Sequence, residues 1–507
     1  MLSKVKSCVL HGLEGNIVEV EVDLSRGLPG FIVVGLPDIS IRESKERVRT
    51  AISNSGYDFP IKKVTVNLSP ANLRKEGSQL DLPIAIALLA AMGEIKKAEN
   101  LNEICILGEI SLDGGINRID GALPMIIAMK QLGYKKFIVP SSNKDECSAI
   151  KDVYVYEFNE LRQVVEWFNG DLNKKPYLNE KIVFNQEKTV LDFSDVKGQK
   201  QVKRAAEIAA AGAHNMLMIG PPGSGKSMIA QRFPSILPSL SFEEALEVTK
   251  IHSVAGLLKN GCLIRSRQFR APHHTISKTA LVGGGIKPMP GEVSLAHLGV
   301  LFLDELPEFN RATLEALRQP LEDGVVTISR VQGSYTYPCS EIMLAAANPC
   351  KCGYYGDPRH ECTCTSAEID RYINKLSGPF LDRMDIQVDV SCVNISDLQN
   401  HAKEESSSEI RSRVEAARNI QRERYKEDGI YSNSELQGKN IEKYCVLDNN
   451  AKKMLEMAFE RMKLSARGYN NILKISRTIA DLERSKEINE THIAEALQYR
   501  QLDRKYH

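Results

Sequence analysis

The sequence predicts an α/β protein with a parallel sheet, followed by a helical C-terminal region, and three observations support this fold class. Short apolar segments of strand length alternate with segments of helical spacing over most of the chain. A glycine-rich loop at residues 220–227 joins one such strand to a helix. Another strand, 299–303, runs directly into two acidic residues, and open parallel sheets bind ligands at the carboxyl ends of their strands.

Length and composition limit the classes of protein that the chain could represent. The length of 507 residues suggests about two to four domains, and the formal charge of +1 excludes a strongly basic chain. Any contact with nucleic acid must therefore come from local patches. No apolar run is long enough to cross a bilayer, and the first residues lack the apolar core of a secretory signal. We therefore expect a cytoplasmic protein with no membrane partner.

Composition and periodicity divide the chain into four parts. Residues 1–170 predict an α/β domain, 171–189 a polar linker, 190–395 a second α/β domain, and 396–507 a helical domain. In the first domain we expect strands at 17–22, 31–34, 63–68 and 104–110, with helices at 40–53 and 82–92. In the helical domain we expect helices at 409–426, 449–462 and 469–486.

The glycine-rich loop fits the pattern G-x-x-x-x-G-K-[ST], which wraps nucleotide phosphates. Glycines let backbone N–H groups approach a phosphate chain, and the following helix offers further donors to the anion. Lys226 is expected to reach the β- and γ-phosphates, and the Ser227 hydroxyl to hold Mg²⁺. The alternative is a chance turn rich in Gly and Pro. The loop consists of Gly220, Pro221, Pro222, Gly223, Ser224, Gly225, Lys226 and Ser227.

Polar residues at the ends of two further strands complete an ATPase pattern. Asp304 suits the Mg²⁺ shell, through water, and Glu305 suits the base that polarises the attacking water. The strand 342–347 ends in Asn348, whose amide could orient the same water. Three such strands in this order favour an ATPase that uses ATP and Mg²⁺ over a passive nucleotide sensor.

Four cysteines form a cluster in a predicted insertion at 350–364. Two C-x-C pairs are separated by nine residues, and four thiolates are suitable ligands for tetrahedral Zn²⁺. The spacing is tighter than the usual C-x₂-C, and His360 could replace one thiolate. A structural Zn²⁺ site and four reduced cysteines on a polar loop are the two alternatives. The cluster consists of Cys350, Cys352, Cys362 and Cys364.

Residues 323–337 predict a β-hairpin. Arg330 and Tyr335 could touch a phosphate and stack on a base of DNA, or both could pack between subunits. The adjacent His273 and His274 are expected to satisfy local hydrogen bonds.

Several segments show a family resemblance over nearly the whole chain. The chain resembles the ComM/YifB-type magnesium-chelatase-like AAA+ proteins, which implies an AAA+ module with a parallel sheet and a helical lid. The loop at 220–227 is then Walker A, and Asp304 and Glu305 form Walker B. Asn348 is then sensor 1. The resemblance also implies hexameric rings and DNA branch migration during natural transformation. It is carried by residues 29–38, 42–49, 269–275, 303–309 and 348–350.

The same resemblance gives two arginines implied roles. Arg383 precedes a predicted strand at 386–390, where an isolated Arg commonly forms a surface ion pair. In ring ATPases an Arg at this place projects into the neighbouring subunit's site, so Arg383 is the implied arginine finger. Arg467 is the implied sensor 2, which would contact the γ-phosphate from the lid. Arg477 is the competing candidate in the same helix.

Residues 1–170 resemble the Lon-protease (S5-type) fold. Segments 75–78 and 108–114 lie where Lon proteases carry their active-site residues. That chemistry needs a Ser nucleophile beside a Lys base. Ser78 falls a few residues early, and 119–127 lacks the expected Lys. The resemblance therefore implies a non-proteolytic domain used for assembly or substrate contact.

Together these features predict a ring-forming motor that hydrolyses ATP to ADP and phosphate and acts on branched or single-stranded DNA. The expected role is that of a branch-migration helicase in recombination or natural transformation, working as a homo-oligomer that is expected to be a hexamer with nucleotide. Two alternatives stay open. One is a chelatase-type AAA+ motor that remodels a protein partner, and the other is a Lon-like ATP-dependent protease.

Overall fold

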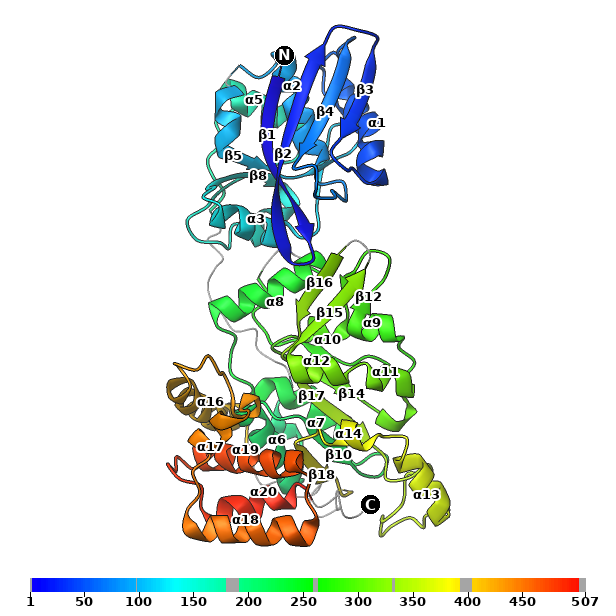
Figure 1. Ribbon diagram of the computed structural model, residues 1–507, viewed down its shortest axis with the longest axis vertical. Coiled ribbons are helices and arrows are strands. Elements are labelled where there is room, and N and C mark those ends of the chain that lie inside the picture. The colour runs from blue at the N-terminus through cyan, green and yellow to red at the C-terminus, as the bar shows by residue number, and fades with distance from the viewer. Residues whose placement is uncertain are drawn as a thin grey trace. The chain divides into compact units, whose positions relative to one another are not determined.

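The computed structural model contains two compact units, each with its own sheet (Figure 1). The residues described are 2–96, 98–178, 191–258, 263–330, 333–392 and 404–500. The first unit comprises 1–185, 242–264 and 327–337, and the second comprises 186–241, 265–326 and 338–507. Most of the predicted linker 171–189 and the predicted boundary at 395 lie outside the described residues.

The first unit is built on a mixed seven-stranded sheet with the order β3-β4-β2-β1-β5-β8-β9. The central pair is antiparallel and runs in register from Leu2 opposite Asp23 to His11 opposite Glu14. Every second side chain along most of β2 is buried, as expected for a strand with one face on a core. The strands are β1 (Leu2–His11), β2 (Glu14–Ser25), β3 (Gly30–Val34), β4 (Lys63–Ser69), β5 (Ile104–Ile106), β8 (Lys136–Pro140) and β9 (Tyr154–Phe158).

Two differences from the sequence analysis concern this sheet. The central strand β1 was not predicted at all. The predicted strand 104–110 is divided into β5 and β6 (Glu109–Ile110), because β5 continues the main sheet while β6 pairs with β7 (Ile116–Asn117). The strands predicted at 17–22, 31–34 and 63–68 are confirmed by β2, β3 and β4.

Helices cover the sheet of the first unit. Helix α2 is buried along almost its whole length and packs against β1, β2 and α1, which confirms the apolar helix predicted at 82–92. Helix α8 also belongs to this unit and packs against α3. The helices are α1 (Ile39–Asn54), α2 (Asp81–Met92), α3 (Ala122–Gln131), α4 (Lys144–Cys147), α5 (Leu161–Asn169) and α8 (Phe242–Val254).

The second unit is built on a parallel five-stranded sheet with the order β11-β14-β17-β10-β18. Its middle strands are buried at every position, which is typical of a parallel sheet covered on both faces. The strands are β10 (Met216–Ile219), β11 (Phe269–Arg270), β14 (Val300–Leu303), β17 (Ile342–Ala347) and β18 (Ile386–Asp389).

One helix precedes the first of these strands, and shorter helices follow between and around the others. They are α6 (Lys200–Gly212), α7 (Lys226–Arg232), α9 (Lys278–Val282), α10 (Glu292–Leu295), α11 (Arg311–Glu315), α12 (Arg318–Asp323), α13 (Ser366–Ile373) and α14 (Gly378–Leu381). A further strand pair of this unit is β12 (Gly283–Gly284) with β13 (Met289–Pro290). The predicted hairpin of β15 (Val325–Arg330) with β16 (Gly333–Pro338) lies almost wholly in the first unit.

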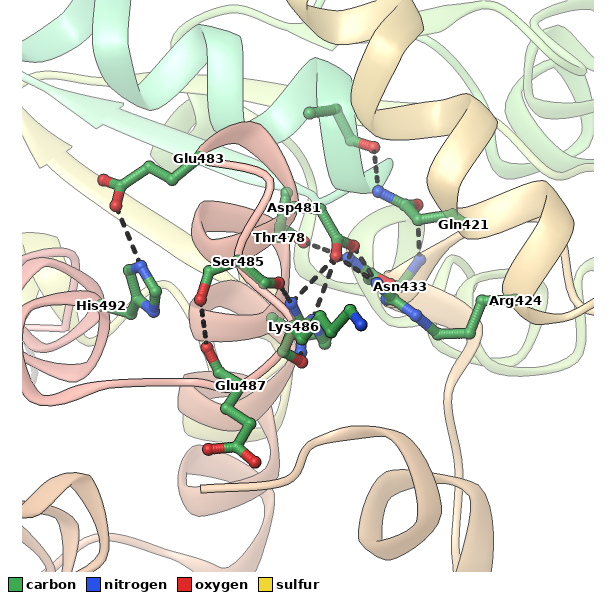
Figure 2. Close-up of polar contacts among 12 residues, drawn as sticks. Gln421, Arg424, Asn433, Thr478, Asp481, Glu483, Ser485, Lys486, Glu487 and His492 are labelled. Atoms are coloured by element: carbon green, nitrogen blue, oxygen red, sulfur yellow. Dashed lines mark hydrogen bonds and ion pairs between the residues drawn. The ribbon is translucent and has the colours of Figure 1, made fainter. Parts of the chain in front are cut away.

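The C-terminal helices share one hydrophobic core with α6 and the parallel sheet. Figure 2 shows polar contacts within this region, where the Asp481 carboxylate accepts hydrogen bonds from Arg424 and Asn433. Helix α18 confirms the helix predicted at 449–462. The helices are α16 (Ser407–Arg424), α17 (Lys439–Tyr444), α18 (Asn449–Met462), α19 (Ala466–Leu482) and α20 (Glu490–Gln498). No helix in the described part of the chain is both long enough and apolar enough to cross a bilayer.

Candidate functional site

The glycine-rich loop connects the carboxyl end of β10 to the first turn of α7. Gly223 and Gly225 have φ of 73° and 91°, in the left-handed region that favours glycine. At Gly220 a Cβ would lie 2.2 Å from the carbonyl oxygen of Val390, so any larger residue would displace the neighbouring chain. The glycines are therefore required by the backbone path of the loop itself.

The ammonium group of Lys226 is held at this loop. It donates hydrogen bonds to the carbonyl oxygens of Gly220 at 2.8 Å and Pro221 at 2.9 Å, and it lies 3.3 Å from Oδ1 of Asn348. Burial lowers the pKa of Lys226. The structure thus brings the predicted lysine and the predicted amide together at the carboxyl edge of the parallel sheet.

Ser227 and Asp304 meet at the same edge. The Ser227 hydroxyl donates to Oδ2 of Asp304 at 2.8 Å, and Asp304 directly follows β14. A hydroxyl and a carboxylate within hydrogen-bond distance are the oxygen ligands that Mg²⁺ takes beside bound phosphates. The side chains present therefore fit the metal that the sequence predicts.

Glu305 adopts a left-handed backbone conformation, with φ of 50°. Its backbone N–H donates to Oδ1 of Asp304 at 2.9 Å, and its side chain is 57% exposed. His274 Nδ1 lies 3.4 Å from Oε2 of Glu305. His273 makes the expected local hydrogen bond, with Thr275, whereas the approach of His274 to the predicted base was not expected from the sequence.

Arg383 lies at the amino-terminal ends of the strands of the same sheet, which we call the amino edge, opposite the carboxyl edge that carries the phosphate loop. Its carbonyl oxygen accepts a hydrogen bond from the Asn215 side chain, and Asn215 directly precedes β10, whose other end leads into the phosphate loop. A strand rises about 3.3 Å per residue, so roughly 15 Å of β10 separates the two ends. The guanidinium of Arg383 is nearly buried, and it pairs with Glu322 and donates to the Pro379 carbonyl.

Arg467, at the start of α19, pairs with the same carboxylate, at 2.5 Å from Oε1 of Glu322. The hydrogen bond from Arg467 lowers the pKa of Glu322, and burial lowers the pKa of Arg383. The structure does not bring Arg467 to the phosphate loop of its own chain. It groups the two predicted arginines instead, around an acidic residue that the sequence analysis missed.

A cavity of about 840 Å³ opens beside this arginine pair and is lined by Arg383, Arg467, Lys474, Glu322 and Glu341 among others. Both carboxylate oxygens of Glu341 are buried and have no hydrogen-bond partner among the residues that the structure describes. Burial raises the pKa of Glu341 to about 8. The cavity is therefore polar, and its lining carries both acidic and basic side chains.

Arg477, the competing candidate, has a different environment. Its side chain is 1% exposed, lies 3.1 Å from the Asp481 carboxylate, and donates to the carbonyl oxygens of Ser485 and Lys486. Asp481 is the centre of the network in Figure 2. Because all these partners belong to the helical region, Arg477 stabilises the packing of α19 and is not available to a ligand.

The four cysteines of the insertion converge. The Sγ atoms of Cys350, Cys352 and Cys362 lie 3.3 to 3.7 Å apart, and all four ligand atoms, with that of Cys364, lie within 4.8 Å of one another. Zn–S bonds of about 2.3 Å in a tetrahedron place the sulfur atoms roughly 3.8 Å apart. The donor set and its spacing fit a thiolate-bound Zn²⁺.

In the first unit, the predicted hairpin residue Tyr335 is buried and stacks on His11 of β1, with ring centroids 4.2 Å apart. Arg330 is exposed. Tyr335 therefore has a packing partner within its own chain, which was neither of the roles considered from the sequence.

The segments similar to Lon active sites carry structural contacts. Ser78 donates to Glu109. Lys75 is fully buried and donates to backbone carbonyls, including that of Gly35 at 3.1 Å. Asp81 is buried in an ion pair with Arg47, 2.7 Å from its Nε. Within the described residues, Ser78 is thus paired with a carboxylate and not with a lysine.

Similarity to known proteins extends over nearly the whole chain. Residues 192–398 match the family described as magnesium chelatase, subunit ChlI, residues 20–143 match subunit ChlI of Mg-chelatase, and 404–500 match its C-terminal region. The chain is 43% identical to protein YifB of Salmonella typhimurium, covering 97% of this chain and 96% of that one. It is 42% identical to the competence protein ComM of Haemophilus influenzae, covering 99% and 98%. A weaker similarity, 26% over 183 residues, links 32% of the chain to 32% of Lon protease 2 of Bacillus subtilis.

Proposed function

The chain belongs to the ComM/YifB-type magnesium-chelatase-like family, and on that premise we propose that it is a ring-forming ATPase motor that acts on DNA. One observation carries the proposal. The phosphate-binding residues and the arginine pair lie at opposite edges of one parallel sheet, so one chain offers two incomplete halves of a site. Repeated head-to-tail association of identical copies would join them and close into a ring.

In this proposal the carboxyl edge binds ATP. The phosphate loop supplies backbone donors, and Lys226 neutralises charge on the phosphates. Ser227 and Asp304 would hold Mg²⁺, which neutralises phosphate charge when bound. Glu305 accepts a proton from the attacking water, and the Asn348 amide orients that water. The left-handed turn at Glu305 leaves its carboxylate exposed for that role.

The amino edge completes the site of the next subunit. Arg383, together with Arg467, would reach a neighbour's nucleotide and stabilise charge on the transferred phosphoryl group. A triphosphate would take over the role that Glu322 fills in the isolated chain, since both arginines already converge on one anion. The C-terminal helices α16 to α20 act as the lid, and their shared core with α6 couples lid movement to the sheet.

DNA is the proposed substrate, and the similarity to a competence protein favours a role in recombination or natural transformation. The formal charge of +1 means that DNA contacts come from local basic residues such as the exposed Arg330. A structural Zn²⁺ in the cysteine cluster is part of the proposal, because the four sulfur atoms already have metal-ligand spacing.

The first unit has a proposed role in assembly or substrate contact, with a fold related to the Lon-protease domain. A Lon-like protease is disfavoured because Ser78 pairs with Glu109. A chelatase-type motor that remodels a protein partner is the second candidate, and the names of the matching families, which cover 20–143, 192–398 and 404–500, favour it.

The test is the rate of phosphate release by the full chain, alone and with branched, single-stranded or duplex DNA, at several salt concentrations. We expect stimulation by branched or single-stranded DNA that declines as salt rises, because phosphate contacts release counterions. Glu305→Gln should bind ATP and lose turnover by about 100-fold or more. An ATPase rate indifferent to every DNA, or normal turnover by Glu305→Gln, would contradict the proposal. Casein degradation would revive the protease alternative.

A further inference from the structure

The cysteine cluster lies directly against the phosphate loop. Gly353, between the two C-x-C pairs, has φ of 90°, and a Cβ at this position would lie 2.8 Å from both Cγ and Cδ of Pro222. Pro222 is the third residue of the phosphate loop. The backbone of the cysteine loop therefore approaches the phosphate loop more closely than any side chain would permit.

The ends of the cysteine loop are tied to both strands that flank β10. Cys350 is fully buried and follows β17 by way of Asn348, whose Oδ1 accepts from Lys226. Farther along the loop, Asp357 accepts a hydrogen bond at 3.6 Å from Sγ of Cys392. Cys392 lies three residues after the end of β18. Because β17 and β18 are the two neighbours of β10, the cysteine loop bridges the strand ends on either side of the phosphate loop.

The two C-x-C pairs meet through their sulfur atoms, and the rings of Tyr354 and His360 in the segment between them lie with centroids 4.8 Å apart. Thiols are weak hydrogen-bond donors and acceptors, so contacts between reduced cysteines contribute little to the order of the nine-residue segment 353–361. A tetrahedral metal would connect all four side chains covalently and close that segment. Gly353 lies within the closed segment, so metal binding would fix its position against Pro222.

We propose that a Zn²⁺ ion held by Cys350, Cys352, Cys362 and Cys364 braces the phosphate loop through Gly353 and so sets its affinity for nucleotide. This inference rests on the proposed nucleotide site. It adds that nucleotide affinity depends on zinc, although none of the proposed catalytic residues is a zinc ligand. The metal acts at a distance from the phosphates, by holding Pro222 and Asn348 in the binding geometry.

Two glycines of the same loop provide a matched test. Gly353 and Gly356 both have left-handed backbone, with φ of 90° and 79°, but a Cβ at Gly356 would meet nothing within 4 Å. Gly353→Ala and Gly356→Ala therefore impose a similar backbone cost, and only the first disturbs the contact with Pro222. Metal content by elemental analysis and the Kd for a fluorescent ADP analogue would be measured for both full-length variants, for wild type, and for Cys364→Ser.

We expect wild type to bind about one zinc per chain. Gly353→Ala should keep the zinc and bind nucleotide about tenfold more weakly, whereas Gly356→Ala should match wild type in both respects. Cys364→Ser should lose the zinc and weaken nucleotide binding at least as much, while the conservative Cys445→Ala, outside the cluster, should change neither.

Three results would overturn the inference. They are wild-type protein without stoichiometric zinc, equal nucleotide affinity in Gly353→Ala and Gly356→Ala, or loss of zinc in Cys364→Ser with unchanged affinity. The failure of the proposed function looks different, because wild-type protein would then bind no nucleotide at any zinc content. Metal retention in Gly353→Ala also reports that its loop is folded.

Discussion

The two edges of the parallel sheet in the second unit differ in how their chemistry is assembled. The carboxyl edge has backbone donors, the cation Lys226 and the acids Asp304 and Glu305, arranged around one loop. The amino edge has two guanidinium groups that share a single carboxylate, Glu322. In the proposed function, the first edge binds a phosphate chain and positions water, and the second supplies positive charge. Neither edge is a complete site, and each has what the other lacks.

In the proposed assembly, this difference places the sites between neighbouring copies of the chain. Groups on opposite ends of a rigid strand cannot meet within one chain, because β10 holds them roughly 15 Å apart. They can meet when the amino edge of one copy faces the carboxyl edge of the next. Such a heterologous contact, repeated with rotation, generates a ring.

The largest predicted effect comes from damaging one edge of the sheet at a time. Lys226→Ala should abolish nucleotide binding, and Arg383→Ala should lower turnover by about 10³-fold. A 1:1 mixture of the two inactive variants should regain about one quarter of wild-type ATPase, because one seam in four pairs an intact loop with an intact arginine. Phosphate release after mixing and reassembly is the measurement.

A second mixture is the control for the first. Lys226→Ala with Glu305→Gln should give no rescue, since both changes damage the carboxyl edge and no seam has an intact one. Rescue in both mixtures, or in neither, would show that Arg383 does not act across a subunit boundary.

The next effect separates the two arginines of α19. Arg467 belongs to the amino edge of the sheet, whereas Arg477 belongs to the buried network around Asp481. Arg477→Met should lower the free energy of unfolding by about 3 kcal/mol, because it leaves the Asp481 network and two carbonyl groups underpaired in the interior. Arg467→Met, at an exposed ion pair, should change stability by less than about 0.5 kcal/mol and instead slow ATP turnover. Urea unfolding followed by circular dichroism, together with ATPase assays, would distinguish them. Equal destabilisation by both changes would contradict the assignment.

The smallest predicted effect concerns the amino-edge cavity. Because burial raises the pKa of Glu341 from 4.5 to about 8, the folded chain binds a proton there that the unfolded chain has lost. The free energy of unfolding therefore falls as the pH rises from about 4.5 to 8. The loss of stability caused by Glu341 is largest at pH 8 and above. Glu341→Gln removes the ionisation and should therefore stabilise the nucleotide-free protein more at pH 8 than at pH 5.

Thermal melting at both pH values would check this expectation. Glu435→Gln is the matched variant, since Glu435 lines the same cavity but accepts a hydrogen bond from Ser432. A gain for Glu341→Gln that does not depend on pH would exclude ionisation as the cause.

Local sequence patterns predicted much of the fold, with instructive exceptions. The helices at 82–92 and 449–462 were predictable because their apolar spacing lies within one continuous segment. Strand β1 was missed although it lies at the centre of the first sheet. It carries Lys4 and Lys6, whose side chains pair with Glu19 of the neighbouring strand β2. These polar positions are therefore explained only when β2 lies beside β1.

The sequence alone determined the phosphate loop, the acidic residues after β14 and the cysteine cluster. In each case the chemistry depends on residues that are near one another along the chain, and the spacing itself encodes the geometry. Only the tertiary structure decided that Arg383 and Arg467 share Glu322, that His274 approaches Glu305, and that Gly353 touches Pro222. Those contacts join residues from separate loops, and their distances depend on how the strands are ordered in the sheet, which no local pattern specifies.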